Sequence, residues 1–230
     1  MFISRIAILL SVAFAMMIGV QAQNCLKSNG YTAGFTVTSF NTYYPAGGAI
    51  EPLSFFEVGD TSVDYDGLRM RVNYEFTMAG QPVANGSLWG FGTINKMYIL
   101  SQGVCTIAPL SFPIQTLLNG SVVGMTKLGQ LDVQVWKIAA GGLPTNQELF
   151  YDNVNCAGVS SLISNADPST PGYSTMLFFD FVDQYTESYF DLPSQCTQPD
   201  QIATFTNGYQ EKETFPHIPK SLHHLLRSGN

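Results

Sequence analysis

One stretch of nine residues limits the fold more than any other part of this 230-residue chain. The stretch from Leu68 to Phe76, LRMRVNYEF, has an apolar residue at every second position and a charged or polar residue between them. A two-residue period places the apolar side chains on one face of a β-strand, whereas a helix would scatter them around its circumference. The stretch therefore predicts a strand with one buried face and one face in water.

Weaker patterns of the same kind recur along the chain. Residues 35–37 lie in a β-branched stretch, and residues 131–138 alternate between apolar and polar side chains. Clusters of glycine and proline separate the apolar runs, and helical periodicity is scarce. Many short strands divided by such turns are typical of an antiparallel sandwich or an open barrel, so the chain is predicted to be all-β.

The run MLFFDFV, residues 176–182, predicts a further strand with Leu177, Phe179 and Phe181 on one face. Residues 185–190 follow after only two intervening residues. A connection this short predicts a hairpin between the two segments.

The N-terminal segment reads as a secretion signal. Arg5 precedes an apolar run from Ile6 to Met17, and the segment closes on Val20-Gln21-Ala22, a small-x-small cleavage pattern. The run is shorter than the roughly 20 apolar residues that a membrane span needs. We therefore expect residues 1–22 to be removed and the protein to be secreted to the extracellular space.

Composition and charge restrict what remains. Residues 23–196 are expected to form one β domain. Residues 197–230 are polar and contain several prolines, and they are expected to form a flexible tail.

The formal net charge is -7 and no cluster of Lys or Arg is present, which disfavours nucleic-acid binding. Charged residues make up 12% of the chain and hydrophobic residues 45%, which suits a large core or a core with an apolar cavity.

The four cysteines indicate two disulfides. No two of the four cysteines have the CxxC spacing that zinc sites and thioredoxin-like sites commonly use, so neither kind of site has support. The cysteines are Cys25, Cys105, Cys156 and Cys196. An even number of cysteines in a secreted chain favours structural disulfides. Spacing leaves all three pairings open.

Two sequons predict a glycoprotein. Asn85-Gly86-Ser87 and Asn119-Gly120-Ser121 each lie at a glycine-containing segment between apolar runs, where we expect turns that expose a glycan.

The motifs of catalysis are missing from the sequence. No G-x-S-x-G occurs, and no cysteine is left over once two disulfides form. The three histidines, His217, His223 and His224, all lie in the tail. We therefore expect a protein that is not an enzyme and that requires no cofactor.

Acidic residues gather in two places and raise the question of calcium. The groups are Asp60, Asp64 and Asp66, and Asp180, Asp183 and Glu187. Oxygen-rich groups bind calcium, which is available outside cells. The alternative, which we favour, is that they decorate the wet face of strands, with Asp64 and Asp66 facing Arg69 and Arg71. No residue is assigned as a metal ligand.

The apolar faces of the predicted strands offer two interpretations. They form an ordinary core, or they line a lipid-sized pocket if a curved sheet stays open on one side. The candidate residues are Leu68, Met70, Val72, Tyr74, Phe76, Leu131, Val133, Val135, Leu177, Phe179 and Phe181.

From Asp64 to Cys196 the chain resembles the ependymin-related family of secreted glycoproteins. The similar segments are Tyr65 to Val72 (YDGLRMRV), Met97 to Cys105, Pro113-Ile114, Leu131 to Trp136, and Phe190 to Cys196 (FDLPSQC). The resemblance implies two curved antiparallel sheets forming an open half-barrel or sandwich around a hydrophobic pocket, akin to bacterial lipoprotein carriers. It also implies lipid binding, a tendency to dimerise, calcium association, and the disulfides Cys25–Cys156 and Cys105–Cys196. The 34-residue tail departs from the family pattern.

Together these observations predict a secreted, disulfide-stabilised all-β glycoprotein that holds a lipid or other hydrophobic molecule in an apolar pocket. Arg69, Arg71 or Tyr98 would meet the polar head of the ligand. The rival hypothesis is an extracellular matrix or adhesion protein that binds other proteins and uses the same apolar faces as a plain core.

Overall fold

The computed structural model describes residues 29–46, 49–110, 114, 120–138, 143–198 and 202–204. The signal segment, Cys25, Asn119 and most of the tail lie outside these residues, so what the sequence predicts for them stays a prediction.

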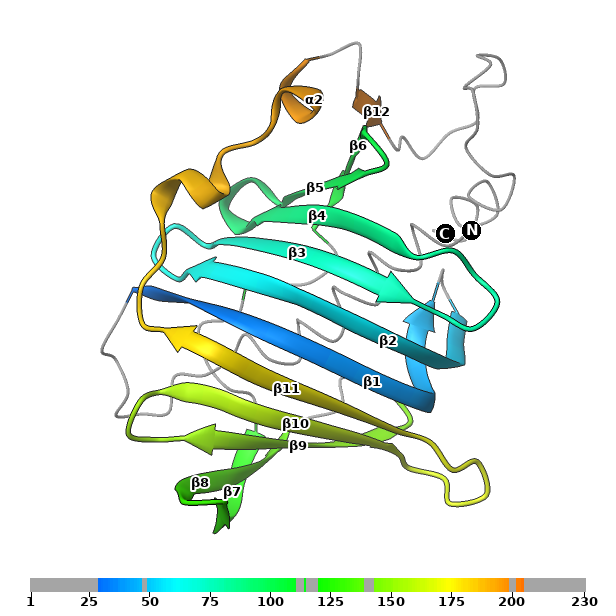
Figure 1. Ribbon diagram of the computed structural model, residues 1–230, viewed down its shortest axis with the longest axis vertical. Helices are drawn as coiled ribbons and strands as arrows, with labels where there is room; N and C mark the ends of the chain where they lie inside the picture. The colour runs from blue at the N-terminus through cyan, green and yellow to red at the C-terminus, as the bar shows by residue number, and fades with distance from the viewer. Residues whose placement is uncertain are drawn as a thin grey trace.

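The described residues form one sheet of twelve strands (Figure 1). In chain order the strands are β1 (Gly30–Ala46), β2 (Ala49–Asp64), β3 (Arg69–Thr77), β4 (Ala84–Phe91), β5 (Lys96–Ser101), β6 (Val104–Pro109), β7 (Gly120–Leu128), β8 (Leu131–Ile138), β9 (Thr145–Asp152), β10 (Ala157–Asn165), β11 (Tyr173–Val182) and β12 (Ile202–Thr204). Their spatial order is β12-β6-β5-β4-β3-β2-β1-β11-β10-β9-β8-β7. Every pairing is antiparallel except that of β12 with β6.

The all-β, antiparallel prediction is confirmed, but the expected two sheets are one. Strands β1–β6 form one meander and β7–β11 a second, each with neighbours paired in sequence order. The two meanders do not stack face to face, because β1 hydrogen-bonds to β11 from Thr32 to Phe40 and joins them edge to edge. The ends of the sheet, β12 and β7, are not paired with each other, so the sheet stays open.

The central strands β1 and β2 are far longer than the short β-branched stretch predicts. They pair over almost their whole lengths, with a break in register between Ser39 and Thr42. Asn41 lies in this break with a φ of 49°, a left-handed conformation that asparagine tolerates better than most residues. An extra residue of this kind bends a strand, and the ends of β1 and β2 turn away from the plane of the sheet (Figure 1).

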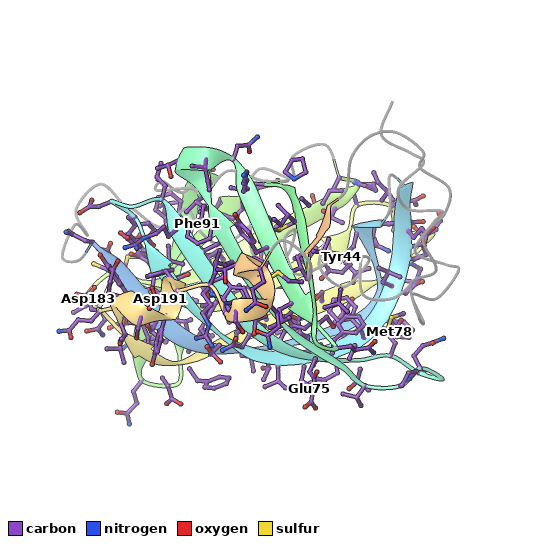
Figure 2. All side chains as sticks on the ribbon, turned by 90° about the horizontal axis from the view of Figure 1, so that it is seen from above. Tyr44, Glu75, Met78, Phe91, Asp183 and Asp191 are labelled. Carbon is purple, nitrogen blue, oxygen red and sulfur yellow. A yellow bond between two sulfur atoms is a disulfide. The ribbon has the colours of Figure 1, made fainter. Side chains whose placement is uncertain are left out.

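The sheet is curved and has two distinct faces. Figure 2 shows Tyr44 on the inner side of the curve and Glu75 on the outer side. Alternation along β3 agrees, since Met70, Val72, Tyr74 and Phe76 are buried and the residues between them are more exposed. We call the two sides the concave face and the convex face.

Strand β11 departs from its predicted pattern. Its register against β1 shifts between Gly34 and Thr32, and Asp180 has a φ of 52°. The bulge turns Phe181 toward the concave face, where it stacks on Tyr31 at 5.4 Å, and leaves Leu177 and Phe179 on the convex face. The prediction that Leu177, Phe179 and Phe181 share one face is therefore wrong.

The predicted hairpin after β11 is also wrong. Residues 187–190 form a 3-10 helix, η2 (Glu187–Phe190), and a four-residue helix, α2 (Ser194–Thr197), follows. A second short 3-10 helix, η1 (Gly92–Ile94), links β4 to β5. In the described part of the chain no helix has the length and apolar character needed to cross a membrane.

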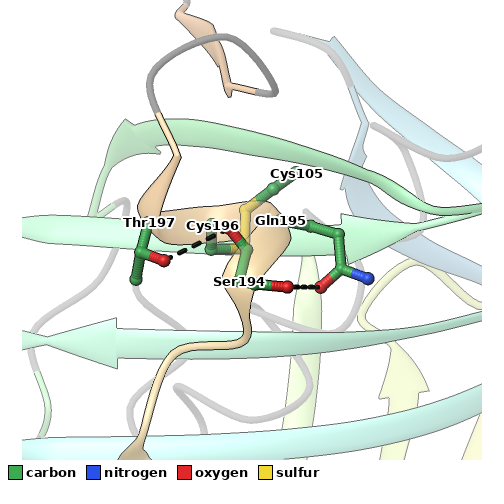
Figure 3. Close-up of a disulfide and its surroundings, with 5 residues drawn as sticks. All are labelled: Cys105, Ser194, Gln195, Cys196 and Thr197. Carbon is green, nitrogen blue, oxygen red and sulfur yellow. Dashed lines mark hydrogen bonds between the residues drawn. A yellow bond between two sulfur atoms is a disulfide. The ribbon is translucent and has the colours of Figure 1, made fainter.

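Residues 183–198, which we call the strap, run from the end of β11 past β1–β3 to β5 and β6 (Figure 1). Cys196 in α2 is bonded to Cys105 in β6 (Figure 3), which confirms one of the two disulfides that the resemblance implies. Cys156 is also disulfide-bonded. Its predicted partner Cys25 lies outside the described residues, so that pairing stays a prediction.

Candidate functional site

A cluster of apolar side chains covers the concave face. Aromatic rings form its centre: Phe55 lies 5.0 Å from Phe76 and 5.4 Å from Tyr44, measured between ring centroids. Strands from both meanders contribute, since Met176 of β11 and Ile163 of β10 belong to the same cluster as the residues of β1–β5. We call this set the concave cluster. Its large buried apolar area is the main source of stability for a sheet of this kind.

A group of polar side chains lies inside the concave cluster. Tyr44, Glu57, Thr61 and Tyr74 are all buried, and alternation along β2 places Glu57 and Thr61 on the face of Phe55. Tyr74 of β3 lies opposite Gly59, which stands between Glu57 and Thr61 on the same face. We call these four residues the polar island.

In the part of the chain that the structure describes, no polar side-chain atom of the island has a partner at full hydrogen-bond geometry. The hydroxyls of Ser39 and Ser174 lie near that of Tyr44, and Ser101 lies near Tyr74, and these contacts oppose the rise that burial causes in the pKa of each tyrosine. The unpaired atoms are the hydroxyl oxygens of Tyr44, Thr61 and Tyr74 and both carboxyl oxygens of Glu57. Leaving a buried polar group unpaired costs about 1–3 kcal/mol. Five such atoms in one region are unusual in a plain core, where nearly all buried polar groups are paired.

Burial changes the acidity of the polar island. Loss of water raises the pKa of Glu57 from its ordinary value near 4.5 to about 8, because the charged form is the one that burial penalises. Burial is also the main reason why the pKa of Tyr44 rises to about 12 and that of Tyr74 rises above its ordinary value. The Glu57 charge contributes to both tyrosine shifts, so the three groups lie close enough to interact.

The described residues place no buried positive charge near the ionised form of Glu57. Among the described residues, no lysine, arginine or histidine is buried. The concave face therefore presents one acid among hydroxyls and aromatic or aliphatic carbon, since the buried Ser39, Ser101 and Ser174 lie there beside the polar island.

The structure brings some of the predicted pocket residues together. Met70, Val72, Tyr74 and Phe76 belong to the concave cluster, and Phe181 packs against it. Leu68 precedes β3 in a turn, where its φ is 49°.

Other predicted pocket residues lie elsewhere. Leu177 is 50% exposed and Phe179 is 43% exposed, both on the convex face. On β8, Val133 is buried while Leu131 and Val135 are half-buried, and none of the three belongs to the concave cluster.

The predicted head-group residues are on the wrong face. Arg69 lies on the convex face, where Nη1 donates to Glu187 Oε1 at 2.5 Å and Nε donates to the buried Asp64 at 2.8 Å. Arg71 pairs with Asp60 at 3.7 Å. Tyr98 faces Phe91 on the neighbouring strand.

The convex side chains hold the strap instead. Arg69 lies over the ring of Phe190 and Arg71 over the ring of Tyr189, at 4.6 and 5.2 Å. Trp89 donates from Nε1 to the Tyr189 carbonyl at 3.1 Å. Ion pairing to Arg69 lowers the pKa of Glu187.

The acidic groups decorate the convex face in part as expected. Asp64 pairs with Arg69, whereas Asp66 is exposed in the turn that precedes β3. Within the residues described, no three Asp, Glu, His or Cys side chains come together in a way that could hold a metal ion.

The first sequon lies in a strand and not in the expected turn. Asn85 is the second residue of β4, opposite Glu75 on the convex face, and its side chain is exposed. Gly86 is needed in β4 because a Cβ there would come within 2.6 Å of the Tyr74 hydroxyl oxygen. Glycosylation stays a prediction at both sequons.

Sequence reasoning missed the polar island. Glu57 stands in an apolar run, LSFFEV, and a single acidic residue at the in-facing position of such a strand was the available signal. A similar group on β9 was missed too, where Thr145, Gln147 and Tyr151 each have an unpaired buried oxygen.

Comparison with known sequences finds a family profile that matches most of the chain. Residues 23–222 match the family profile described as "Ependymin domain, amoebozoa". The chain belongs to the ependymin family. An uncharacterised protein of Dictyostelium discoideum is 30% identical to this chain over 187 residues, 77% of its length. The aligned region spans only 58% of that relative's length.

Solved structures resemble this chain more distantly. The crystal structure of MucB matches with a TM-score of 0.35 and 11% identity, over 81% of this chain and 64% of MucB. The structure of PNGF-II matches with a TM-score of 0.36 and 10% identity, over 86% of this chain and 33% of that one.

Proposed function

We propose that the protein is secreted and that it binds a lipid or another apolar molecule against the concave face. The observation that supports this most directly is the polar island, because unpaired polar atoms inside an apolar cluster suit a surface that a ligand completes. Burial of an acyl chain would supply about 0.8 kcal/mol for each CH₂ group.

Two further observations are consistent with this function. Membership of the ependymin family and the Cys105–Cys196 disulfide fit an extracellular protein, since disulfides persist in oxidising compartments. Calcium association and dimer formation are implied by the resemblance alone and are not part of the proposal.

The test is binding of 1,6-diphenylhexatriene, a hydrocarbon fluorophore, to protein purified from culture medium, together with native mass spectrometry. We expect a saturable gain in fluorescence and a co-purifying lipid. Val72→Asp should weaken binding by placing a charge in the concave cluster, whereas Leu177→Asp on the convex face should not. Wild-type protein that retains no lipid and gives no fluorescence gain would refute the proposal.

A second candidate function is binding of other proteins by the convex face. Phe40 and Tyr173, whose rings lie 6.0 Å apart, are exposed on this face, and Leu177 and Phe179 are exposed further along β11. Exposed apolar patches commonly mark interaction sites. If this function is the correct one, Leu177→Asp and not Val72→Asp will abolish attachment of the protein to extracellular matrix.

A further inference from the structure

The composition of the polar island restricts which head group it can accept. All five unpaired atoms are oxygens. The three hydroxyls can donate or accept a hydrogen bond, whereas the ionised carboxylate of Glu57 can only accept. The groups that face Glu57 from neighbouring strands and can titrate are Tyr44 of β1 and Tyr74 of β3. Both have raised pKa values and therefore stay neutral near pH 7.

We propose that the polar island binds the primary ammonium group of a long-chain amine, with Glu57 as its counter-ion and Tyr44 and Tyr74 as hydrogen-bond acceptors. This inference rests on the proposed function and names its ligand class. An ammonium group has three N–H donors, and a carboxylate with two hydroxyl oxygens can accept all three. The pair would carry no net charge, which is the condition for burying ions.

Other head groups fit less well. A carboxylate or phosphate would meet no buried cation in the described chain, and above about pH 8, where Glu57 is ionised, it would bring a second negative charge next to Glu57. An alcohol offers a single donor and leaves most of the unpaired oxygens as they are. A trimethylammonium group has no N–H at all, so it could neutralise Glu57 but could not pair with the hydroxyls.

The amine should bind more tightly as the pH rises. Ionised Glu57 is the form that binds an ammonium, and burial holds this carboxyl protonated below about pH 8. Between pH 6 and pH 8 we expect the affinity for the amine to rise by up to about tenfold per pH unit and then to level off. An amine with a pKa near that of lysine, about 10.4, stays protonated over this range. Affinity for an alcohol should change little.

The experiment is displacement of bound 1,6-diphenylhexatriene by four twelve-carbon competitors below their micelle concentrations. These are dodecylamine, dodecanol, dodecanoate and dodecyltrimethylammonium. At pH 8 we expect dodecylamine to bind about tenfold or more tightly than dodecanol, and dodecanoate to bind most weakly. Equal or tighter binding of dodecanoate or dodecyltrimethylammonium would overturn the inference.

Three variants locate the effect. Glu57→Gln should retain the fluorophore and lose both the preference for the amine and its pH dependence. Tyr74→Phe should weaken amine binding several-fold without changing dodecanol binding. Glu75→Gln, an equivalent change on the convex face, should leave every affinity unchanged. An amine preference that survives Glu57→Gln would contradict the inference, and a wild-type protein that binds no fluorophore at all would refute the proposed function together with it.

Discussion

Glu57 shows how one residue can set both the stability and the chemistry of a site. Its side chain is 1% exposed, and neither carboxyl oxygen is paired within the described structure. The folded state therefore keeps the proton up to about pH 8, whereas the unfolded chain releases it near pH 4.5. Because the folded state binds more protons across this window, the free energy of unfolding must fall as the pH rises through it.

Glu57→Gln should remove this pH dependence, because an amide of similar shape does not titrate. The variant should be more stable than the wild type at pH 8, by on the order of a few kcal/mol, and similar to it near pH 4.5. Urea unfolding at several pH values measures the difference. A wild type that gains stability relative to the variant between pH 5 and pH 8 would show that Glu57 is charged in the folded protein.

Arg69 has the opposite role on the convex face, where it neutralises the buried Asp64. Arg69→Met should destabilise the protein by about 3 kcal/mol, because it leaves the Asp64 carboxylate buried without a balancing positive charge, although the Gly67 backbone N–H still donates to it. Adding Asp64→Asn should recover a large part of the loss. If the double variant is no more stable than the single variant in chemical denaturation, the loss comes from packing of the Arg69 stem and not from the unpaired charge.

At the scale of elements, the strap is held to the sheet by covalent, ionic and aromatic contacts. The disulfide joins residues separated by 91 positions. Between the end of β11 and Cys196, the strap is also held by the Arg69–Glu187 ion pair and by the hydrogen bond from Trp89 to the Tyr189 carbonyl. The sheet ladders do not depend on any of these contacts. The strap can therefore loosen while the sheet remains folded.

Replacing both Cys105 and Cys196 by serine should lower the free energy of unfolding by about 2–4 kcal/mol, chiefly by enlarging the unfolded ensemble. We also expect faster chymotrypsin cleavage at Tyr185, Tyr189 or Phe190 in the native state, with the far-ultraviolet circular dichroism unchanged. Mass spectrometry of the fragments identifies the sites. First cleavage within the β1–β5 meander would contradict an independent strap.

At the scale of the whole molecule, the seam between β1 and β11 makes one sheet from two meanders. Where β11 pairs with β1, adjacent residues of β11 point to opposite faces of the sheet. Met176 is 4% exposed within the concave cluster, while Leu177 is on the convex face. Packing across the seam, and not only its hydrogen bonds, therefore connects the two halves.

Met176→Ala should cost about 2–5 kcal/mol of unfolding free energy, as large-to-small changes in a core do. Leu177→Ala, one position away, should cost less than about 1 kcal/mol because the side chain is already half in water. Equilibrium urea unfolding of both variants gives the comparison. Equal losses would mean that β11 is not oriented as described.

The sequence by itself determined the strands in which apolar and polar residues alternate regularly. Strands β3 and β8 have their predicted bounds to within one residue, and burial along β3 follows the predicted alternation, because a two-residue apolar period suits only an extended chain. The long strands β1 and β2 were less visible, since Ser39, Glu57 and Thr61 interrupt the apolar positions of their concave faces. The Cys105–Cys196 pairing came from the resemblance and not from spacing.

Only the tertiary structure decided which residues share a face and how the meanders join. The bulge at Asp180, where φ is 52°, places Phe181 on the concave face although Leu177 is on the convex face. No local sequence pattern predicts this bulge. The edge-to-edge joining of β1 and β11 depends on hydrogen bonds between segments more than 130 residues apart. The polar island has the same origin, because an acid and two tyrosines from three strands become neighbours only when those strands pair and curve. Local periodicity selects a strand, but the partner of that strand and the environment of its side chains are properties of the whole sheet.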